Sequence, residues 1–573
     1  MIQILKNHRW AIILAFVASV IVASPQIYFR YTHPSDYQGI EVFGTGDERA
    51  WLSRVREVAD GHPAMSNVYF KDGKGEPYIY QPLGSNIIAF LGKIFSLDIN
   101  NTMLLSRFIF PAFVFLLIYG FAFFLSKNKL IALAVSSFLM LGNSLFARKA
   151  VFQMLGGDSP SVTYVNYTRP VNPLMTHLFF FSFLLCFWLF LERKQWRWGI
   201  LSFLLLGLSF YDYFYTWTFL YSFLGALLVI FIFQKKWLDI KRICLVISAS
   251  LLMAIPYFIN LYQVIRHPVY KEVGHRLAFE GSSATLGLLA PLLFAIVLLF
   301  FPRKWKERYY FVLALAIAPL IVLNQQIITG KVLSNAHYHW YFHLPLAAIF
   351  LLLIFFHWVS LKKQSFFQKA PAIAIIAVSI FTAVWIQKAS YAENEKNMVA
   401  LQRYGPVMDW LSENSQKDEV VFSDSQTAQL IVIYTPLNVF YHSTAKYSLA
   451  ATNERLANAL FLYYRLDNVT GEQAKDVFFR DRDGISGALY GIYYRDTTGA
   501  YGNIPDELLL ELVRKYQETF SLATSRLFQE ALNKYEVKYL VWDKRDYPFW
   551  QIDQYQFLEK TAEIGDFVIY RKI

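Results

Sequence analysis

The sequence predicts a polytopic α-helical membrane protein with about 11 spans, followed by a C-terminal α/β domain outside the cytoplasm. Of its 573 residues, 55% are hydrophobic and only 17% are charged, whereas soluble proteins carry about a quarter charged residues. The apolar residues form runs of about 20, the length that crosses a bilayer. The basic residues behind the net charge of +12 lie in small clusters between those runs, a distribution that argues against a nucleic-acid partner.

The expected spans follow from the positions of the apolar runs. They are 10–29, 103–125, 130–146, 174–191, 199–210, 214–233, 243–262, 284–301, 309–328, 342–359 and 371–386. Pro25 follows the small-residue exit of the first run, so we expect that run to be retained and not cleaved as a signal peptide. The run 199–210 is too short to cross alone, and we expect it to form a helical hairpin with 214–233 that turns near Asp212.

The loops between the runs alternate in charge, which predicts the topology. Short basic loops define the cytoplasmic face by the positive-inside rule and place the N-terminus there. Longer mixed loops, at 30–102, 148–173, 263–283 and 324–341, belong outside. We therefore expect an integral membrane domain over 1–390, in contact with membrane lipids and with its first external loop at 30–102, and an extracytoplasmic domain over 391–573.

The C-terminal part has the pattern of an ordinary soluble domain. The segments "EVVFSD", "NVFYH", "VKYLVWD" and "DFVIYR" are typical of strands. The segments "DELLLELVRKYQETF" and "SRLFQEALNKY" have apolar residues at helical spacing. Strands that alternate with helices predict a small α/β domain.

The first external loop contains a short charged helix, "FGTGDERAWLSRVREVADGHP", at residues 43–63. Thr45 and Glu48 have the spacing of a capping box, and Gly61 ends the helix. This places Asp47 in the first turn of an amphipathic helix just outside the membrane. Asp47 and Glu48 could simply complement the helix dipole. Capping explains Glu48 well enough that it stays a weaker candidate for the site.

The order of these features resembles the membrane glycosyltransferases of the GT-C superfamily, which include protein mannosyltransferases, aminoarabinose transferases and oligosaccharyltransferases. The matching residues are Asp47, Trp51 and Gly61, then Pro82-Leu83 at the start of a second helix; the chain has Gln81 where the family commonly has another proline. The resemblance implies transfer of a sugar from a polyprenyl-phosphate donor to a glycan, lipid or protein acceptor on the outer face. It implies that Asp47 is the catalytic base, or orients the acceptor and any metal.

The second external loop supplies an acid and three basic residues. Asp158 follows two glycines, which is common in turns; family members often have a second acid here, sometimes as a two-acid metal motif, so Asp158 is a second catalytic candidate. One acid alone leaves a divalent metal open and no cofactor certain. Arg148, Lys149 and Arg169 put positive charge on the outer face, where it suits a lipid phosphate or simply a headgroup.

The remaining candidates lie in the fourth external loop and at the hairpin tip. Lys331, His337 and His339 stand where the family contacts the lipid carrier, and we expect them to bind phosphate or sugar. His339 and His343 have the spacing of zinc ligands, but the glutamate of the helical zinc motif is missing. Asp212 is an acid inside an apolar run, which marks it as a functional candidate.

Two other classes of function remain open at this point. A transporter or lipid flippase would tend to show internal repeats and charged or broken helices at mid-membrane, whereas here nearly all the charge lies in loops. A non-catalytic membrane scaffold would use the C-terminal domain to bind a partner.

Overall fold

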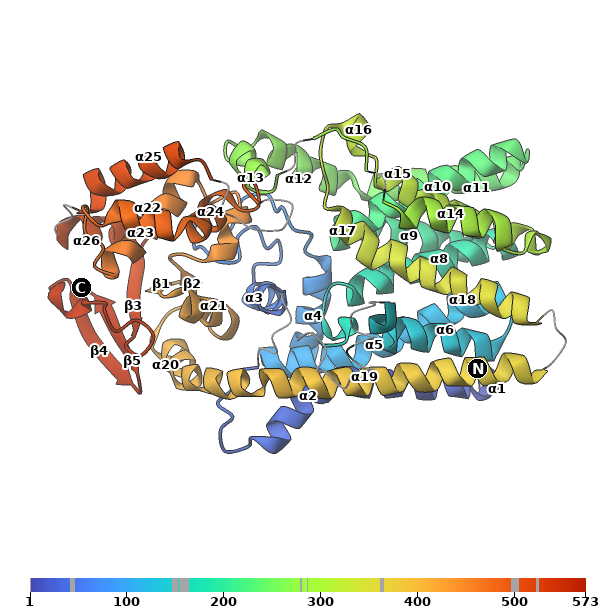
Figure 1. Ribbon diagram of the computed structural model, residues 1–573, viewed down its shortest axis with the longest axis horizontal. Helices are drawn as coiled ribbons and strands as arrows, with labels where there is room; N and C mark the ends of the chain where they lie inside the picture. Colours follow the sequence, from blue (N-terminus) through green and yellow to red (C-terminus); the bar gives the residue numbers. More distant parts are fainter. Residues whose placement is uncertain are drawn as a thin grey trace.

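The protein is a bundle of long helices with a smaller domain at one end (Figure 1). The computed structural model describes residues 2–41, 47–146, 153, 164–278, 281–285, 287–360, 365–495, 504–521 and 525–573. The end of the bundle beside the smaller domain is called the domain end below, and the opposite end, where the N-terminus lies, is the far end (Figure 1).

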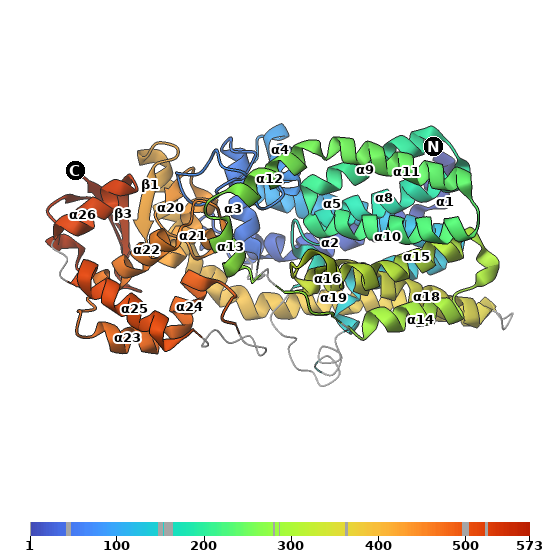
Figure 2. The same ribbon diagram turned by 90° about the horizontal axis from the view of Figure 1, so that it is seen from above.

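The long helices of the bundle run along its length between these two ends, and short helical segments connect or extend them (Figures 1 and 2). They are α1 (Ile2–Asn7), α2 (Arg9–Thr32), α5 (Ile99–Ser126), α6 (Lys129–Leu141), α8 (Leu174–Arg193), α9 (Trp196–Asp212), α10 (Phe214–Phe233), α11 (Trp237–Met253), α12 (Ile255–Arg266), α14 (Leu289–Phe300), α15 (Glu307–Val322), α16 (Gln326–Thr329), α17 (Asn335–Tyr338), a π-helical turn η4 (His339–His343), α18 (Leu344–Ser360) and α19 (Ser365–Leu401).

The bundle confirms a polytopic helical membrane protein but not the predicted number of spans. In the described part, seven helices are long and apolar enough to cross a membrane, or eight if α11 and α12 are one bent span. Three further expected spans correspond to the shorter helices α6, α9 and α14. The bend of 55° between α11 and α12 falls at Pro256, where the missing backbone N–H removes a helical hydrogen bond.

Small side chains let the first helix of the bundle lie close to its neighbours. Ala11, Ala15 and Ala18 of α2 are all at least 98% buried, and α2 packs against α5, α6 and α19. Between membrane helices, short side chains allow the backbones to approach and gain van der Waals contact. α19 continues past the bundle into the smaller domain, so the proposed boundary at 390 and 391 lies within one helix.

The smaller domain is a mixed sheet surrounded by helices. Its elements are η5 (Gln402–Tyr404), α20 (Gly405–Asn414), β1 (Val420–Ser423), α21 (Ser425–Tyr434), β2 (Asn438–Val439), η6 (Ser443–Tyr447), α22 (Asn453–Leu466), α23 (Ala474–Arg480), α24 (Arg482–Tyr490), α25 (Asp506–Tyr516), η7 (Gln517–Ser521), α26 (Ser525–Lys534), β3 (Val537–Asp543), η8 (Ile552–Gln554), β4 (Leu558–Ile564) and β5 (Phe567–Lys572). The strand order is β2-β1-β3-β5-β4. β1 pairs in parallel with β2 and β3, while β5 pairs antiparallel with β3 and β4. The predicted α/β class is therefore confirmed.

Three further elements lie between the bundle and the domain: α3 (Glu48–Ala59), α4 (Leu83–Ile94) and α13 (Tyr270–Arg276) (Figures 1 and 2). Short 3-10 turns, η1 (Asn143–Phe146), η2 (Asn166–Thr168) and η3 (Arg303–Trp305), connect bundle helices. Helix α13 is fastened to the domain by Arg276, whose side chain is 1% exposed. Its Nη1 donates to the carbonyls of Lys446 and Ala451 at 2.8 and 2.7 Å, and its Nη2 donates to Asn453 Oδ1 at 2.6 Å. The charged segment around Arg276 therefore has a structural role, because it joins α13 to the domain.

Candidate functional site

Helix α3 is held between the bundle and the α/β domain by both of its faces. Leu52 and Val55 are 1% exposed on its apolar face. On the domain side, Arg49 Nη1 donates to Gln426 Oε1 of α21 at 2.8 Å. The guanidinium of Arg54 lies 4.4 Å from the ring centre of Trp51 and 4.1 Å from that of Tyr80, in the range of cation–π contacts. These contacts fix the start of the helix and with it Asp47, the residue directly before it.

Asp47 is the residue immediately before α3, and not a member of its first turn as the sequence predicts. Its side chain makes no capping hydrogen bond to the helix, and Thr45, the other half of the expected capping motif, lies outside the described residues. The carboxylate instead forms an ion pair with Arg169, and the Asp47 side chain remains 58% exposed. An accessible carboxylate is therefore presented at the domain end of the bundle.

Glu48 is fully buried, with a role that the sequence interpretation did not include. It forms an ion pair with Arg107 of α5, and the two side chains are 0% and 1% exposed. Arg107 Nε also donates to the carbonyl of Thr168 at 2.9 Å. A buried ion pair is tolerated only when its remaining donors are satisfied in this way. The pair ties the start of α3 to the loop that carries Arg169, and so brings Asp47 and Arg169 together.

Arg169 has donor capacity beyond its bond to Asp47. Its Nη2 donates to Asp47 Oδ2, while its Nε is buried and has no hydrogen-bond partner among the described residues. A guanidinium presents five donors in a planar fork that matches phosphate oxygens. The positive charge of Arg169 also acts on Tyr213 and His337. Two of the predicted phosphate-binding residues, Arg169 and His337, therefore belong to one neighbourhood.

A network of hydrogen-bonded and stacked aromatic side chains lies beside Arg169 and His337. The hydroxyl of Tyr213 is hydrogen-bonded to Nδ1 of His337, whose ring stacks on Tyr215 with centroids 4.7 Å apart. Deeper in the bundle, His177 Nε2 donates to the carbonyl of Tyr341 at 2.6 Å. Because that carbonyl can only accept, His177 Nδ1 must accept the 2.7 Å bond from the Tyr167 hydroxyl. The network holds η4 and the segment around His337 against α8 and α10.

Asp212 lies at the end of α9, and neither of its oxygens has a hydrogen-bond partner among the described residues. The residue is only 4% exposed, although the tip of a hairpin could have given it water or a bond from Tyr211 or Tyr213. Tyr211 donates to the carbonyl of Met253 instead. A Cβ on Gly84 would come within 3.3 Å of Asp212 Oδ1, so the glycine lets the first turn of α4 approach the carboxylate. The positive end of that helix dipole favours an acid there.

The other predicted site residues are not all drawn into this neighbourhood. Lys331 is exposed in the loop before α17. His339 lies beside His343 in the π-helical turn, with ring centroids 5.8 Å apart. No group of three or more histidine, cysteine or acidic side chains that could hold a metal gathers in the described part of the chain. Arg148, Lys149 and Asp158 lie outside the described residues.

Sequence reasoning did not identify Arg107, Tyr213 or His177 as parts of the site. Arg107 and His177 are polar residues inside apolar helices, and that signal alone could have marked them. Tyr213 carried no such signal, because tyrosine is frequent throughout this chain, with 37 copies.

Comparison with known proteins gives distant structural likenesses only. No family model and no curated protein matches the sequence. The chain is similar over 94% of its length to 69% of the Archaeoglobus fulgidus oligosaccharyltransferase in the apo form, with a TM-score of 0.47 and 12% identity. It is similar over 97% of its length to 97% of ArnT from Cupriavidus metallidurans bound to undecaprenyl phosphate, with a TM-score of 0.46 and 10% identity.

A third structure, the oligosaccharyltransferase AglB from Archaeoglobus fulgidus in complex with an inhibitory peptide and a dolichol-phosphate, is similar over 99% of this chain and 75% of its own, with a TM-score of 0.45 and 12% identity. At TM-scores below 0.5, these likenesses assign neither a donor nor an acceptor to this chain.

Proposed function

We propose that this protein transfers a sugar from a polyprenyl-phosphate-linked donor to a glycan, lipid or protein acceptor on the outer face of the membrane. One observation carries the proposal: an accessible carboxylate, Asp47, lies against an arginine, Arg169, whose Nε has no partner among the described residues. Such a pair offers a base for an acceptor hydroxyl and a donor fork for the phosphate that leaves. The proposal places the domain end and residues 391–573 outside, and the N-terminus in the cytoplasm.

The pairing of Asp47 with Arg169 suggests how the two groups divide the reaction. A carrier phosphate that takes up the donors of Arg169 weakens the hold of Arg169 on Asp47, and the carboxylate becomes more basic. Asp47 then removes the proton of the acceptor hydroxyl. The acceptor oxygen bonds to the anomeric carbon while the bond from that carbon to the phosphate oxygen breaks. The polyprenyl phosphate leaves with the electron pair, and Arg169 stabilises its charge.

Other residues have supporting roles in this proposal. His337, held by Tyr213, lies within the field of Arg169 and is placed to contact the phosphate or the sugar. Asp212 offers two acceptor oxygens to sugar hydroxyls. Arg148, Lys149, Lys331 and His339 stay candidates for binding the carrier phosphate, and Asp158 stays a candidate second acid. A divalent metal stays possible, because Asp158 lies outside the described residues; among those residues Asp47 pairs with an arginine and no cluster of three metal ligands gathers.

The test is a turnover assay with the full chain in liposomes. A panel of sugar-linked polyprenyl phosphates is supplied with a membrane extract as acceptor, and release of free polyprenyl phosphate is followed by mass spectrometry. The proposal expects release that depends on both the protein and the acceptor extract. Movement of intact donor between leaflets without release of polyprenyl phosphate would favour a flippase instead. If no donor gives either release or movement, a non-catalytic membrane scaffold is the function that remains.

A further inference from the structure

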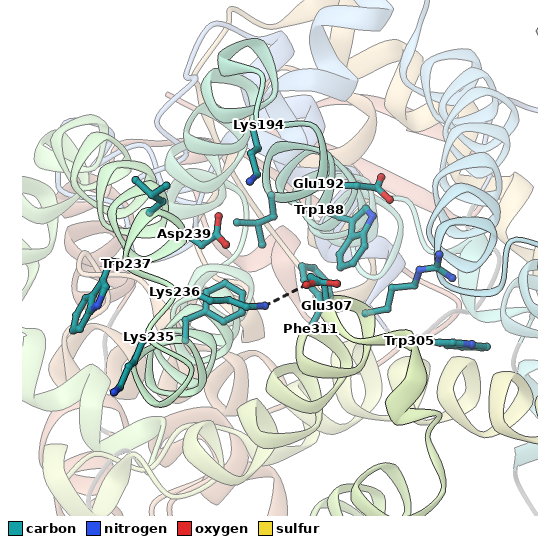
Figure 3. A pocket seen from close by; sticks show the side chains of 14 residues that line it. Trp188, Glu192, Lys194, Lys235, Lys236, Trp237, Asp239, Trp305, Glu307 and Phe311 are labelled. Atoms are coloured by element: carbon teal, nitrogen blue, oxygen red, sulfur yellow. Dashed lines mark hydrogen bonds and ion pairs between the residues drawn. The ribbon is translucent and has the colours of Figure 1, made fainter.

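A cavity of about 690 Å³ opens at the far end of the bundle, away from Asp47 and Arg169. It lies where α8 and α10 end and where α11 and α15 begin (Figures 1 and 3). Figure 3 shows charged side chains from these helices around a space bounded by Trp188 and Phe311. Nothing in the proposed transfer reaction uses this cavity.

Positive charge is in excess among the side chains that line the cavity, once the existing ion pairs are taken into account. Each of its three acids already has a basic partner. Glu307 lies 3.4 Å from Lys236, Asp239 lies 2.6 Å from Arg242, and Glu192 lies 3.8 Å from Lys127. Three lining cations remain, Lys194, Lys235 and Arg308, and none of them forms an ion pair within the part of the chain that the structure describes, although Arg308 Nη1 donates to the carbonyl of Leu125 at 3.1 Å. The cavity therefore has spare positive charge.

One uncharged donor in the wall also has no partner. Trp188 is 4% exposed, and its indole Nε1 is buried without a hydrogen-bond acceptor among the described residues. A buried N–H without an acceptor has lost its hydrogen bond to water and gained none in return, which is unfavourable. Since the ring lines the cavity, a ligand oxygen inside could accept this bond. Cations without an ion pair and an N–H without an acceptor are both satisfied by a ligand with negatively charged oxygens.

The rim of the cavity indicates that the ligand comes from the membrane. Trp237 and Leu238, at the start of α11, are 60% and 66% exposed, although both are large and apolar. Tryptophan at a helix end is typical of the headgroup level of a bilayer. Basic pockets between membrane helices at this level suit the headgroups of anionic lipids.

We infer that this far-end cavity binds the phosphate group of an anionic phospholipid from the adjacent leaflet. Lys194 and Arg308 supply positive charge to the phosphate oxygens, and Lys235 adds charge at the exposed edge of the cavity. Trp188 Nε1 donates to one of the oxygens, and the acyl chains run out past Trp237 and Leu238. Because the site is at the opposite end from Asp47, it is a lipid site separate from the one proposed for the carrier.

The test measures lipid binding to the full chain in detergent by native mass spectrometry. The probes are phosphatidylglycerol, phosphatidylcholine and inorganic phosphate. The variant Lys194→Ala/Lys235→Ala removes two of the spare cations. The matched control, Lys241→Ala/Lys304→Ala, removes two exposed lysines at the same end that do not line the cavity. If each lysine contributes as much as a typical basic residue near an anionic membrane surface, its removal weakens phosphatidylglycerol binding about fivefold, and removal of both lysines weakens it roughly 30-fold.

The inference expects phosphatidylglycerol to bind more tightly than phosphatidylcholine, the control to keep that preference, and the cavity variant to lose it. Trp188→Phe, which deletes one donor and keeps the ring, should weaken phosphatidylglycerol binding severalfold. Equal binding of the two lipids, or unchanged binding by the cavity variant, would overturn the inference. Competition by millimolar inorganic phosphate as effective as competition by the lipid would overturn the membrane source and make this a site for soluble phosphate.

Discussion

Replacement of Arg107 by methionine should destabilise the protein more than any other single change at the site. Methionine keeps the unbranched stem of the side chain but removes the guanidinium that pairs with the Glu48 carboxylate, which is 0% exposed. Removing one partner of a buried pair costs about 3–5 kcal/mol, because the other charge remains buried. The lost bond from Nε to the Thr168 carbonyl, 2.9 Å long, adds about 1 kcal/mol and places the effect near the top of that range.

The assay follows tryptophan fluorescence while the protein in mixed micelles is unfolded by increasing mole fractions of SDS. The double variant Glu48→Gln/Arg107→Met removes both charges, and we expect it to be more stable than Arg107→Met by at least 2 kcal/mol, a coupling typical of direct contact. The exposed control Arg193→Met should change the free energy of unfolding by less than about 0.5 kcal/mol. If Arg107→Met matched the wild type, or if the double variant gained nothing, the buried pair would not be what holds α3 in place.

Three further outcomes can be checked on the same preparations. Burial holds the pKa of His442 at about 3, below its ordinary value of 6.5. Between these two pH values the folded protein keeps the ring neutral while the unfolded chain binds a proton, so the stabilising contribution of His442 is complete above pH 6.5 and the free energy of unfolding should fall by about 2 kcal/mol at pH 5. Denaturant titrations should show this loss in the wild type and not in His442→Gln. Arg276→Ala should free α13 from the domain and expose residues 263–278 to limited proteolysis, whereas the same cleavage pattern as the wild type would refute the structural role of Arg276. Arg169→Ala should weaken equilibrium binding of polyprenyl phosphate at least tenfold, since a charge-assisted hydrogen bond contributes about 1.5–3 kcal/mol; unchanged affinity would exclude Arg169 as a phosphate ligand.

The architecture could be predicted because each of its signals is local. A run of about 20 apolar residues is sufficient evidence for a membrane helix, and the strands β1, β3 and β5 are short buried runs of branched and aromatic residues. β4, "LEKTAEI", escaped prediction because it is an edge strand that is largely exposed and polar. The number of spans stayed uncertain because α6 and α14 are apolar but short, and α9 has only 17 residues.

The site was predictable only in part, because its decisive contacts join distant residues. The sequence located Asp47 and Arg169 in external loops, but their pairing spans 122 positions. A local rule, the capping box, gave Glu48 a sufficient role and hid its partner Arg107, 59 residues away. The burial of Asp212 depends on how closely Gly84 lets α4 approach, which no sequence pattern discloses.

The most direct test of the proposed function compares two isosteric changes in the segment between α2 and α3. Asp47→Asn removes the carboxylate beside Arg169, while Asp36→Asn removes an acid whose side chain is similarly exposed, at 52% against 58%. Loss of a general base lowers turnover by about 10²–10⁴. We predict that Asp47→Asn lowers the rate of sugar transfer at least 100-fold while it still binds the carrier. Asp36→Asn should transfer the sugar at the wild-type rate. Transfer by Asp47→Asn at the wild-type rate would contradict the assignment of Asp47 as the base.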